Sequence, residues 1–473
     1  MINIDDLTIE RAHDALVNKE ITVRELIELY TLRAREKNGE MNAFVELFDD
    51  LDTAIDTAQK KIDDGTGAML TGIPCAIKDN MLYQGHISSC GSKILENYIG
   101  SYDSHVVELL KKEGAIIIGR TNMDEFAMGS STETSYFGKT KNPYDTNRVP
   151  GGSSGGAAAS VAMKSALFSL GSDTGGSIRQ PGALCNLVGF KPTYGTISRS
   201  GLVALASSLD QIGPLTHTVT DAEIVFNALS SVDSKDSTCV PLDIRASHIK
   251  SLKKKIGVPY HFFENGGVQK EILEKFKETL SSLEADGYEL VPLKLEYIHY
   301  SLPVYYIIQP AEASSNLARF DGIRYGYSED HPSLFDVYSK TRGVGLGKEV
   351  RRRILLGTYV LSHGYFDAYY GKAIMMKEQI KKELNTVFET VDVIATPTTA
   401  NTAFMFGEKS GDPVSMYLED IFTVPANITG DPAISIPIGF DEKGLPMGIQ
   451  LIAPAFNEAL LFTIGKDIES TVQ

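Results

Sequence analysis

The first 65 residues place apolar side chains with the period of an α-helix. Two stretches follow this period, and Thr22 with Glu25 forms a capping box that predicts the start of the second helix. A third helix is predicted around residues 51–58. The positions that define the three helices are Leu7, Ala12, Ala15 and Leu16, then Leu26, Leu29, Tyr30 and Ala34, then Leu51, Ala54, Ile55 and Ala58. We therefore expect residues 1–65 to form an N-terminal helical segment packed on a core.

From residue 72 onward the pattern changes to short runs that are apolar at consecutive positions. Six such runs lie at 73–77, 115–118, 166–170, 391–395, 434–438 and 448–452, mostly separated by helix-like segments. Strands that are apolar on both faces are typical of a sheet with helices on both sides. The pattern predicts an α/β fold with a mixed, mainly parallel central sheet. We assign residues 66–473 to this domain, with a more helical and more charged elaboration at about 237–411.

Composition and charge narrow the choice of function. The 473 residues carry a net charge of −16, which disfavours binding of RNA by the chain's own charge. No run approaches the roughly 18 apolar residues of a membrane span. The first residues lack the basic head and apolar core of an export signal, so we expect a cytoplasmic protein that contacts no membrane. The cysteines lack the spacing of metal ligands, which predicts reduced thiols and no metal site.

Two glycine-rich loops are unusual for a globular core. The first is Pro150-Gly-Gly-Ser-Ser-Gly-Gly156, and the second, Gly171-Ser-Asp-Thr-Gly-Gly-Ser177, directly follows an apolar strand. Each loop alone is typical of a tight turn, but a strand that enters a glycine turn can also direct several N–H groups at one oxyanion or phosphate. A phosphate-binding Walker loop needs a Lys-Ser/Thr pair after its last glycine, where this chain has Ala157 and Ile178. The loops therefore favour an oxyanion site.

Amide chemistry needs a nucleophile and a base beside such a site. His86, His105 and His217 have no GxSxG partner, so a Ser-His-Asp triad is not supported. Lys78 ends the nearly uncharged run 72–77, where burial would lower its pKa and make it a candidate base. Asp79 points to the other face of the strand and need not restore the charge of the lysine. A lysine at a strand end is often only a structural cation, and the serine loops are what favour the base.

Lys78, Ser153 and Ser177, together with the two loops, resemble the Lys–Ser–Ser triad and glycine-serine signature of the amidase signature family. The resemblance implies that Ser177 is the acylated nucleophile, that Ser153 relays its proton, and that Lys78 is the neutral base at the end of the relay. It also implies a cis peptide bond before Ser153.

The same resemblance implies an oxyanion hole built from backbone N–H groups of the second loop. One such donor contributes about 2.7–4 kcal/mol to transition-state stabilisation. The donors would include Thr174, Gly175 and Gly176, while Asp173 and Arg179 would support the loop rather than take part in the chemistry.

Within this family, the segments 310–326, 352–358, 364–370 and 417–423 resemble the glutamine-hydrolysing subunits of tRNA-dependent amidotransferases. This implies that free glutamine is the substrate and that ammonia passes to a second subunit. There Glu-tRNA(Gln), or Asp-tRNA(Asn), would be activated with ATP and Mg and then amidated. A small third subunit would wrap this chain, tRNA would be met only through the complex, and no cofactor is expected in this chain.

Glutamine is a zwitterion, so its pocket needs one cation and one anion. By the resemblance, Arg353 would pair with the α-carboxylate and Asp420 with the α-ammonium, and Tyr305 and Tyr306 would line the pocket. Two alternatives stay open. One is a free-standing amidase acting on another small carboxamide, and the other is a catalytically silent assembly subunit, against which the intact triad argues.

Overall fold

A single eleven-stranded sheet organises the computed structural model, which describes residues 3–263, 267–409 and 411–472. The order of strands across the sheet is β1-β3-β2-β4-β6-β5-β10-β11-β9-β7-β8. Their bounds are β1 (Phe44–Leu47), β2 (Pro74–Lys78), β3 (Ile116–Thr121), β4 (Phe168–Asp173), β5 (Val188–Lys191), β6 (Gln211–Thr216), β7 (Lys255–Val258), β8 (Glu289–Pro292), β9 (Val393–Pro397), β10 (Ala433–Phe440) and β11 (Pro446–Ile452).

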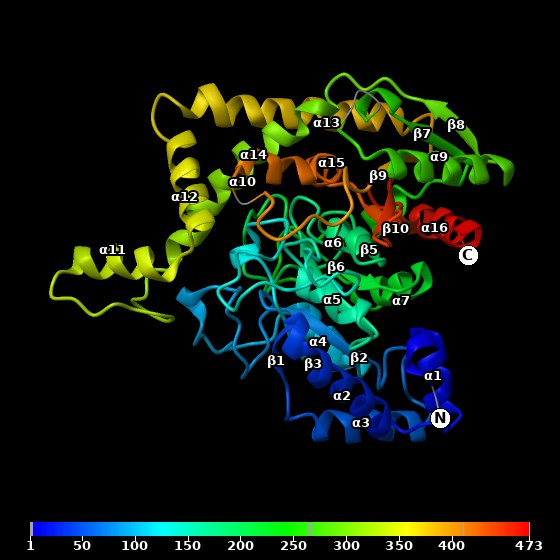
Figure 1. The fold of residues 1–473 in the computed structure, drawn as a ribbon, viewed down its shortest axis with the longest axis horizontal. Coiled ribbons are helices and arrows are strands. Elements are labelled where there is room, and N and C mark those ends of the chain that lie inside the picture. Colours follow the sequence, from blue (N-terminus) through cyan, green and yellow to red (C-terminus); the bar gives the residue numbers. More distant parts are fainter. Residues whose placement is uncertain (1–2, 264–266, 410, 473) are drawn as a thin grey trace.

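Helices surround this sheet (Figure 1). The α-helices are α1 (Ile9–Val17), α2 (Val23–Met41), α3 (Asp52–Asp63), α4 (His105–Glu113), α5 (Gly155–Ala162), α6 (Arg179–Leu184), α7 (Val219–Leu229), α8 (Leu242–Ser247), α9 (Lys270–Ala285), α10 (Ser301–Asn316), α11 (Leu334–Gly345), α12 (Lys348–Val360), α13 (Lys372–Val387), α14 (Pro413–Tyr417), α15 (Val424–Thr429) and α16 (Glu458–Val472). A π-helix, η7 (Phe366–Gly371), joins α12 to α13, and a 3-10 turn, η8 (Leu418–Asp420), follows α14.

The expected α/β class is confirmed, but the expectation of a mainly parallel sheet is wrong. Parallel pairing links β3, β2 and β4 on one side, and β9, β7 and β8 on the other. The six remaining pairings, from β4 through β6, β5, β10 and β11 to β9 and from β1 to β3, are antiparallel. The error has a physical cause: an antiparallel strand that is covered on both faces has the same continuous apolar sequence as a parallel one.

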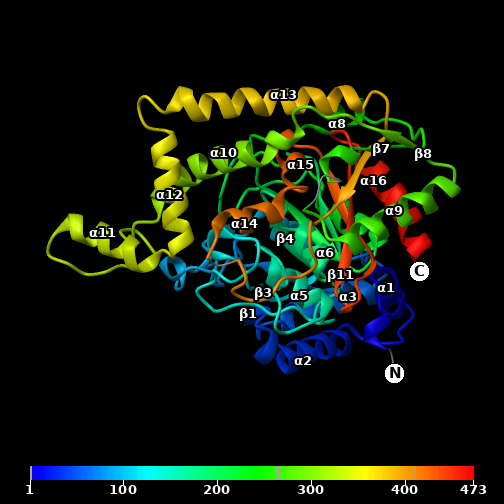
Figure 2. The same ribbon diagram turned by 45° about the horizontal axis from the view of Figure 1, so that its top comes forward.

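Burial shows that both faces of the central strands are covered. Every residue of β2, β3, β4, β6, β9 and β11 is buried. Helices α5 and α6 pack against β2, β4, β5 and β10. Helix α16 packs against α7 and α9, and these three helices also pack against β6 or β10. In both views α11 and α12 extend to one side of the molecule, away from the chain ends (Figure 2).

The N-terminal segment contains the three expected helices, and the capping box between Thr22 and Glu25 is present at the start of α2. It also contributes a strand that was not expected, β1, because four residues are too few to show a period. The elaboration at 237–411 carries three strands of the same sheet: β9, which was expected at 391–395, and β7 and β8, which were not. The division of the chain at residue 65 stays a prediction.

Candidate active site

Lys78 lies at the end of β2 with its ammonium nitrogen among three serine hydroxyls. Nζ is 2.7 Å from Ser153 Oγ, 2.8 Å from Ser154 Oγ and 2.9 Å from Ser172 Oγ. Asn80 donates to the Ser172 hydroxyl at 3.0 Å. Of these partners only Ser153 was expected from the sequence, although Ser154 and Ser172 lie in the same two glycine-rich loops. The two loops and the end of β2 therefore meet at one lysine.

Burial lowers the pKa of Lys78 to about 7, against the attraction of neighbouring carboxylates, of which Asp124 is the strongest. A substantial fraction of this amine is therefore neutral near pH 7. Asp79, the next residue, behaves as the strand geometry predicted. Its carboxylate accepts from Arg120 Nη1 at 2.6 Å instead of pairing with Lys78. The lysine is thus left without a direct carboxylate partner among the described residues, which is the electrostatic condition for a neutral base.

The two serine loops contact each other directly. The peptide between Gly152 and Ser153 is cis, as expected. The N–H of Ser154 donates to the carbonyl oxygen of Ser177 at 3.2 Å, which places the second loop against the first. Ser177 is 9% exposed, at the edge of an otherwise buried loop. The step that joins the Ser153 hydroxyl to the Ser177 hydroxyl stays a prediction.

Asp173 and Arg179 hold the second loop in place. Asp173 accepts from Arg179 Nη2 at 3.0 Å, and both side chains are completely buried. Burial alone would raise the pKa of Asp173, but the charge and hydrogen bonds of Arg179 outweigh it and lower the pKa to about 2. Arg179 also donates to Gln450 at 2.6 Å and to the Thr423 carbonyl at 2.8 Å. The loop is therefore tied to β11 and to the segment after η8.

The predicted oxyanion donors differ in what they contact. The N–H of Gly176 donates to Asp173 Oδ1 at 2.9 Å, so this donor is already engaged by the protein. The hydroxyl of Thr174 donates to Asp210 at 2.7 Å and fixes the first residue of the turn. The role of Thr174, Gly175 and Gly176 as oxyanion donors stays a prediction.

Arg353 and Asp420 are far apart in sequence, but both contact the side chain of Tyr306. The hydroxyl of Tyr306 donates to Asp420 Oδ2 at 3.1 Å, and the guanidinium of Arg353 lies 5.4 Å from the centre of the Tyr306 ring. Ser130 donates to both oxygens of Asp420 at 3.0 Å, and Glu349 accepts from Arg353 Nε at 2.8 Å. Burial raises the pKa of Asp420 to about 7, against the hydrogen bonds of Ser130 and Tyr306. The structure thus gathers a cation and an anion in one place.

Aromatic rings connect this pair to the serine loop. Tyr306 stacks on Tyr417 with ring centres 3.8 Å apart and meets Tyr305 edge-on at 4.9 Å. Tyr305 lies over Gly175, where a Cβ would come within 2.8 Å of its ring. Neither Ser130 nor Tyr417 was expected at the site from the sequence. Tyr417 lies in the segment 417–423 that carries the resemblance, but only the tertiary fold brings it, and Ser130, to the site.

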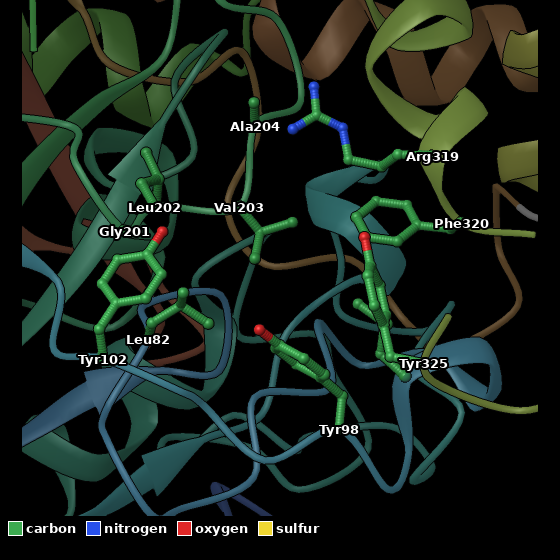
Figure 3. A pocket seen from close by; sticks show the side chains of 11 residues that line it. Leu82, Tyr98, Tyr102, Gly201, Leu202, Val203, Ala204, Arg319, Phe320 and Tyr325 are labelled. Carbon is green, nitrogen blue, oxygen red and sulfur yellow. The ribbon is translucent and has the colours of Figure 1, made fainter. Parts of the chain in front are cut away.

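Two cavities differ in their relation to these residues. One of about 300 Å³ is open to solvent and includes Arg353, Ser130 and Tyr417 in its lining, together with Glu125, Gly129, Ser131, Glu133, Thr134, Gly347, Lys348, Glu349, Arg352, Lys409, Pro413 and Met416. A second cavity, of about 180 Å³, is lined by apolar side chains, three tyrosines and Arg319 (Figure 3). None of the predicted site residues lines the second cavity.

Two further kinds of feature are absent from the part of the chain that the structure describes. Across the described ranges, no group of three or more His, Cys, Asp and Glu side chains is arranged to hold a metal ion. No helix in the same ranges combines the length and the apolar character that crossing a membrane requires.

Comparison with known proteins gives matches along almost the whole chain. The sequence model of the Amidase family matches residues 25–462. The A subunit of glutamyl-tRNA(Gln) amidotransferase from Thermoanaerobacter pseudethanolicus is 49% identical, over 98% of this chain and 96% of that protein. The crystal structure of the corresponding A subunit from Thermotoga maritima superposes with a TM-score of 0.81 at 41% identity, covering 99% of this chain and 95% of the other. Peptide amidase from Stenotrophomonas maltophilia, at 23% identity, shares the fold with a TM-score of 0.80, over 99% and 97% of the two chains.

Proposed function

The chain belongs to the amidase family, and from this premise we propose that it hydrolyses free glutamine as the ammonia-supplying subunit of a tRNA-dependent amidotransferase. The observation that carries the proposal is the meeting of Arg353 and Asp420 at Tyr306, because a zwitterionic substrate needs both charges in one pocket. The amidotransferase part is supported by relatives that are named as the A subunit of glutamyl-tRNA(Gln) amidotransferase and that match over almost their whole length.

The reaction would begin at the buried lysine. Neutral Lys78 takes the proton of Ser153, which takes the proton of Ser177, and Ser177 Oγ attacks the side-chain carbonyl carbon of glutamine. The oxyanion that forms would be bound by those N–H groups of residues 174–177 that the protein does not itself engage, which leaves out the Gly176 N–H held by Asp173. As the C–N bond breaks, Ser153 gives a proton to the leaving nitrogen and regains one from Lys78, so ammonia departs and a glutamyl ester remains on Ser177. Water then attacks this ester by the same relay and releases glutamate.

The substrate pocket would orient glutamine by its backbone charges. Arg353 faces the α-carboxylate and Asp420 the α-ammonium, while Tyr305 and Tyr306 lie beside the side-chain carboxamide. Tyr306 contacts both charged residues, so it fixes the separation between them. A bound charge whose partner is removed is strongly unfavourable in a buried site, which is why the pocket would select a zwitterion over a neutral amide.

The chain would work as part of an assembly with two further subunits. Ammonia would pass to a partner subunit that uses ATP and Mg to activate Glu-tRNA(Gln), or Asp-tRNA(Asn), and a small third subunit would complete a cytoplasmic heterotrimer. The net charge of −16 supports the view that tRNA is bound by another subunit. Purification from the native host tests this part, and co-elution with two further subunits is expected.

Steady-state kinetics on glutamine and on a simple aliphatic amide test the substrate. We expect the parent protein to prefer glutamine, more strongly when its partners are present. Asp420→Ala should raise the KM for glutamine by at least about tenfold, which corresponds to roughly 1.4 kcal/mol. It should change the KM for the neutral amide far less. A parent protein that prefers the neutral amide would instead be a free-standing amidase.

A further inference from the structure

The peptide unit between Gly175 and Gly176 is held from both sides. Its carbonyl oxygen accepts from Thr423 Oγ1 at 2.7 Å, and its N–H donates to Asp173 Oδ1 at 2.9 Å. Both partners are buried, so this peptide cannot rotate without leaving two buried polar groups unpaired. The orientation of the loop that carries the predicted oxyanion donors is therefore set in part by a hydroxyl 248 residues away in sequence.

Thr423 also fills the space beside the loop. A Cβ on Gly176, whose φ is +127°, would come 2.1 Å from Thr423 Oγ1. Only a glycine can adopt this φ and leave room for the hydroxyl. Gly175 is enclosed in the same way by the ring of Tyr305. The side chains of Thr423 and Tyr305 thus pack directly against the loop that carries the nucleophile.

The segment that carries Thr423 also carries the predicted anion of the substrate pocket. Thr423 follows η8, and both its N–H and its hydroxyl lie 3.1 Å from the carbonyl oxygen of Asp420. The carbonyl of Thr423 accepts from Arg179 at 2.8 Å, which anchors the segment to the core. One short turn therefore joins Asp420 at one end to the Gly175–Gly176 peptide at the other.

We propose that Thr423 is a positioning residue that orients the Gly175–Gly176 peptide and couples this orientation to the occupancy of Asp420. A substrate that bears an α-ammonium would pair with Asp420, fix the turn, and so hold the oxyanion donors in their productive geometry. Selectivity for glutamine would then appear in kcat as well as in KM. The identity of the substrate rests on the proposed function, whereas the hydrogen bond that orients the loop does not.

Three variants separate the hydroxyl from its surroundings. Thr423→Val removes the donor and keeps the branched shape, and Thr423→Ser keeps the donor. Thr429→Val is a matched control at another buried threonine, whose hydroxyl donates to the Pro425 carbonyl at 3.1 Å and accepts from the Asp431 N–H at 3.5 Å, with no bond to the Gly175–Gly176 peptide. We expect Thr423→Val to lower kcat by about tenfold or more, with the KM within about threefold of the parent. The reason is that a misplaced Gly175–Gly176 peptide weakens binding of the transition state and leaves binding of the ground state almost unchanged. Thr423→Ser and Thr429→Val should stay within about threefold of the parent.

The coupling is tested by combining Thr423→Val with Asp420→Asn on glutamine. If Thr423 transmits the effect of Asp420, the second substitution should cost less in kcat when the first is present. Strictly multiplicative effects would overturn the coupling, and a Thr423→Ser variant as slow as Thr423→Val would overturn the role of the hydroxyl. The Thr423 series is measured on the neutral amide as well, where Thr423→Val should also lower kcat. The parent protein could prove inactive on glutamine while Thr423→Val still lowers kcat on the neutral amide. That result would refute the proposed substrate and leave the positioning role intact.

Discussion

Arg179 and Asp173 form an ion pair in which neither side chain has any exposed surface, directly behind the loop that ends at Ser177. Removing one member of a buried pair leaves the other uncompensated, which costs about 3–5 kcal/mol of folding free energy. We expect Arg179→Met to lower the free energy of unfolding by this amount, measured by urea denaturation.

The matched control is Arg24→Met on the surface. Arg24 pairs with Asp52 and Asp56, but it is 44% exposed and its partners are more exposed still. Such an exposed pair contributes little to stability, so Arg24→Met should leave the free energy of unfolding nearly unchanged. If the two substitutions cost the same, Arg179 has no special part in holding the nucleophile loop.

Lys78 is expected to be the group whose deprotonation switches on turnover. Because its pKa is lowered to about 7, the neutral form grows as the pH rises through 7, and kcat/KM should rise with it. Lys78→Ala should reduce turnover by roughly two orders of magnitude or more, the usual contribution of a general base. Lys78→Arg should not restore it, because the guanidinium stays protonated.

Lys191 offers a control for the Lys78 variants. It is equally buried, and burial lowers its pKa to about 7 as well, but its Nζ donates to the Pro192 carbonyl and not to a serine. Lys191→Met should keep the pH profile of the parent. A normal pH profile in Lys78→Arg would mean that Lys78 is a structural cation.

Ser177→Ala should abolish amide hydrolysis while preserving the fold, because only a small side chain at the edge of the loop is lost. Mass spectrometry of the parent protein quenched during turnover of glutamine should locate a glutamyl ester on Ser177. The Ser153→Ala variant should show no such ester within the same time. An ester on a different residue would refute Ser177 as the nucleophile.

The affinity for glutamine should depend on pH through Asp420. Burial raises its pKa to about 7, so this carboxyl carries its charge only above that pH. As the pH falls through 7 the carboxyl takes up a proton and no longer attracts the α-ammonium. The KM for glutamine should therefore rise by about tenfold for each pH unit below the pKa.

Asp420→Asn isolates this effect from that of Lys78. The variant should have a high KM that no longer changes between about pH 6 and 8, while kcat should still follow the titration of Lys78. A parent KM that is flat across the same range would show that Asp420 does not titrate in the free enzyme.

Part of the fold was predictable because strands that are buried on both faces are visible in the sequence as runs of apolar residues. Six strands appeared as apolar runs, and the catalytic lysine and the second serine loop lie at the ends of two of them, β2 and β4. β6 was missed because Gly213 and Pro214 are residues that strand rules exclude from a sheet interior. The structure explains the glycine: a Cβ at Gly213 would come 2.0 Å from the Phe190 carbonyl oxygen of the neighbouring β5. The sequence around Gly213 does not reveal that β5 lies so close to it.

The site was predictable where its residues share a local pattern. Ser153 and Ser177 stand in glycine loops whose composition is unusual in itself, and Lys78 ends an uncharged strand. Ser130 has no such signal, and Thr423 lies in the segment 417–423 with nothing local to mark its role. Each acts through one hydroxyl on a group 290 or 248 residues away. Residues of this kind become visible only when the fold is known.

The order of the strands also has a consequence at the two margins of the sheet. A free edge strand exposes unpaired backbone groups onto which another polypeptide can add. One margin is β1, four residues long with an irregular register against β3. The other is β8, also four residues long, whose last residue, Pro292, has no N–H to offer. Neither margin provides a long, regular template, so this large sheet is protected from edge-to-edge aggregation.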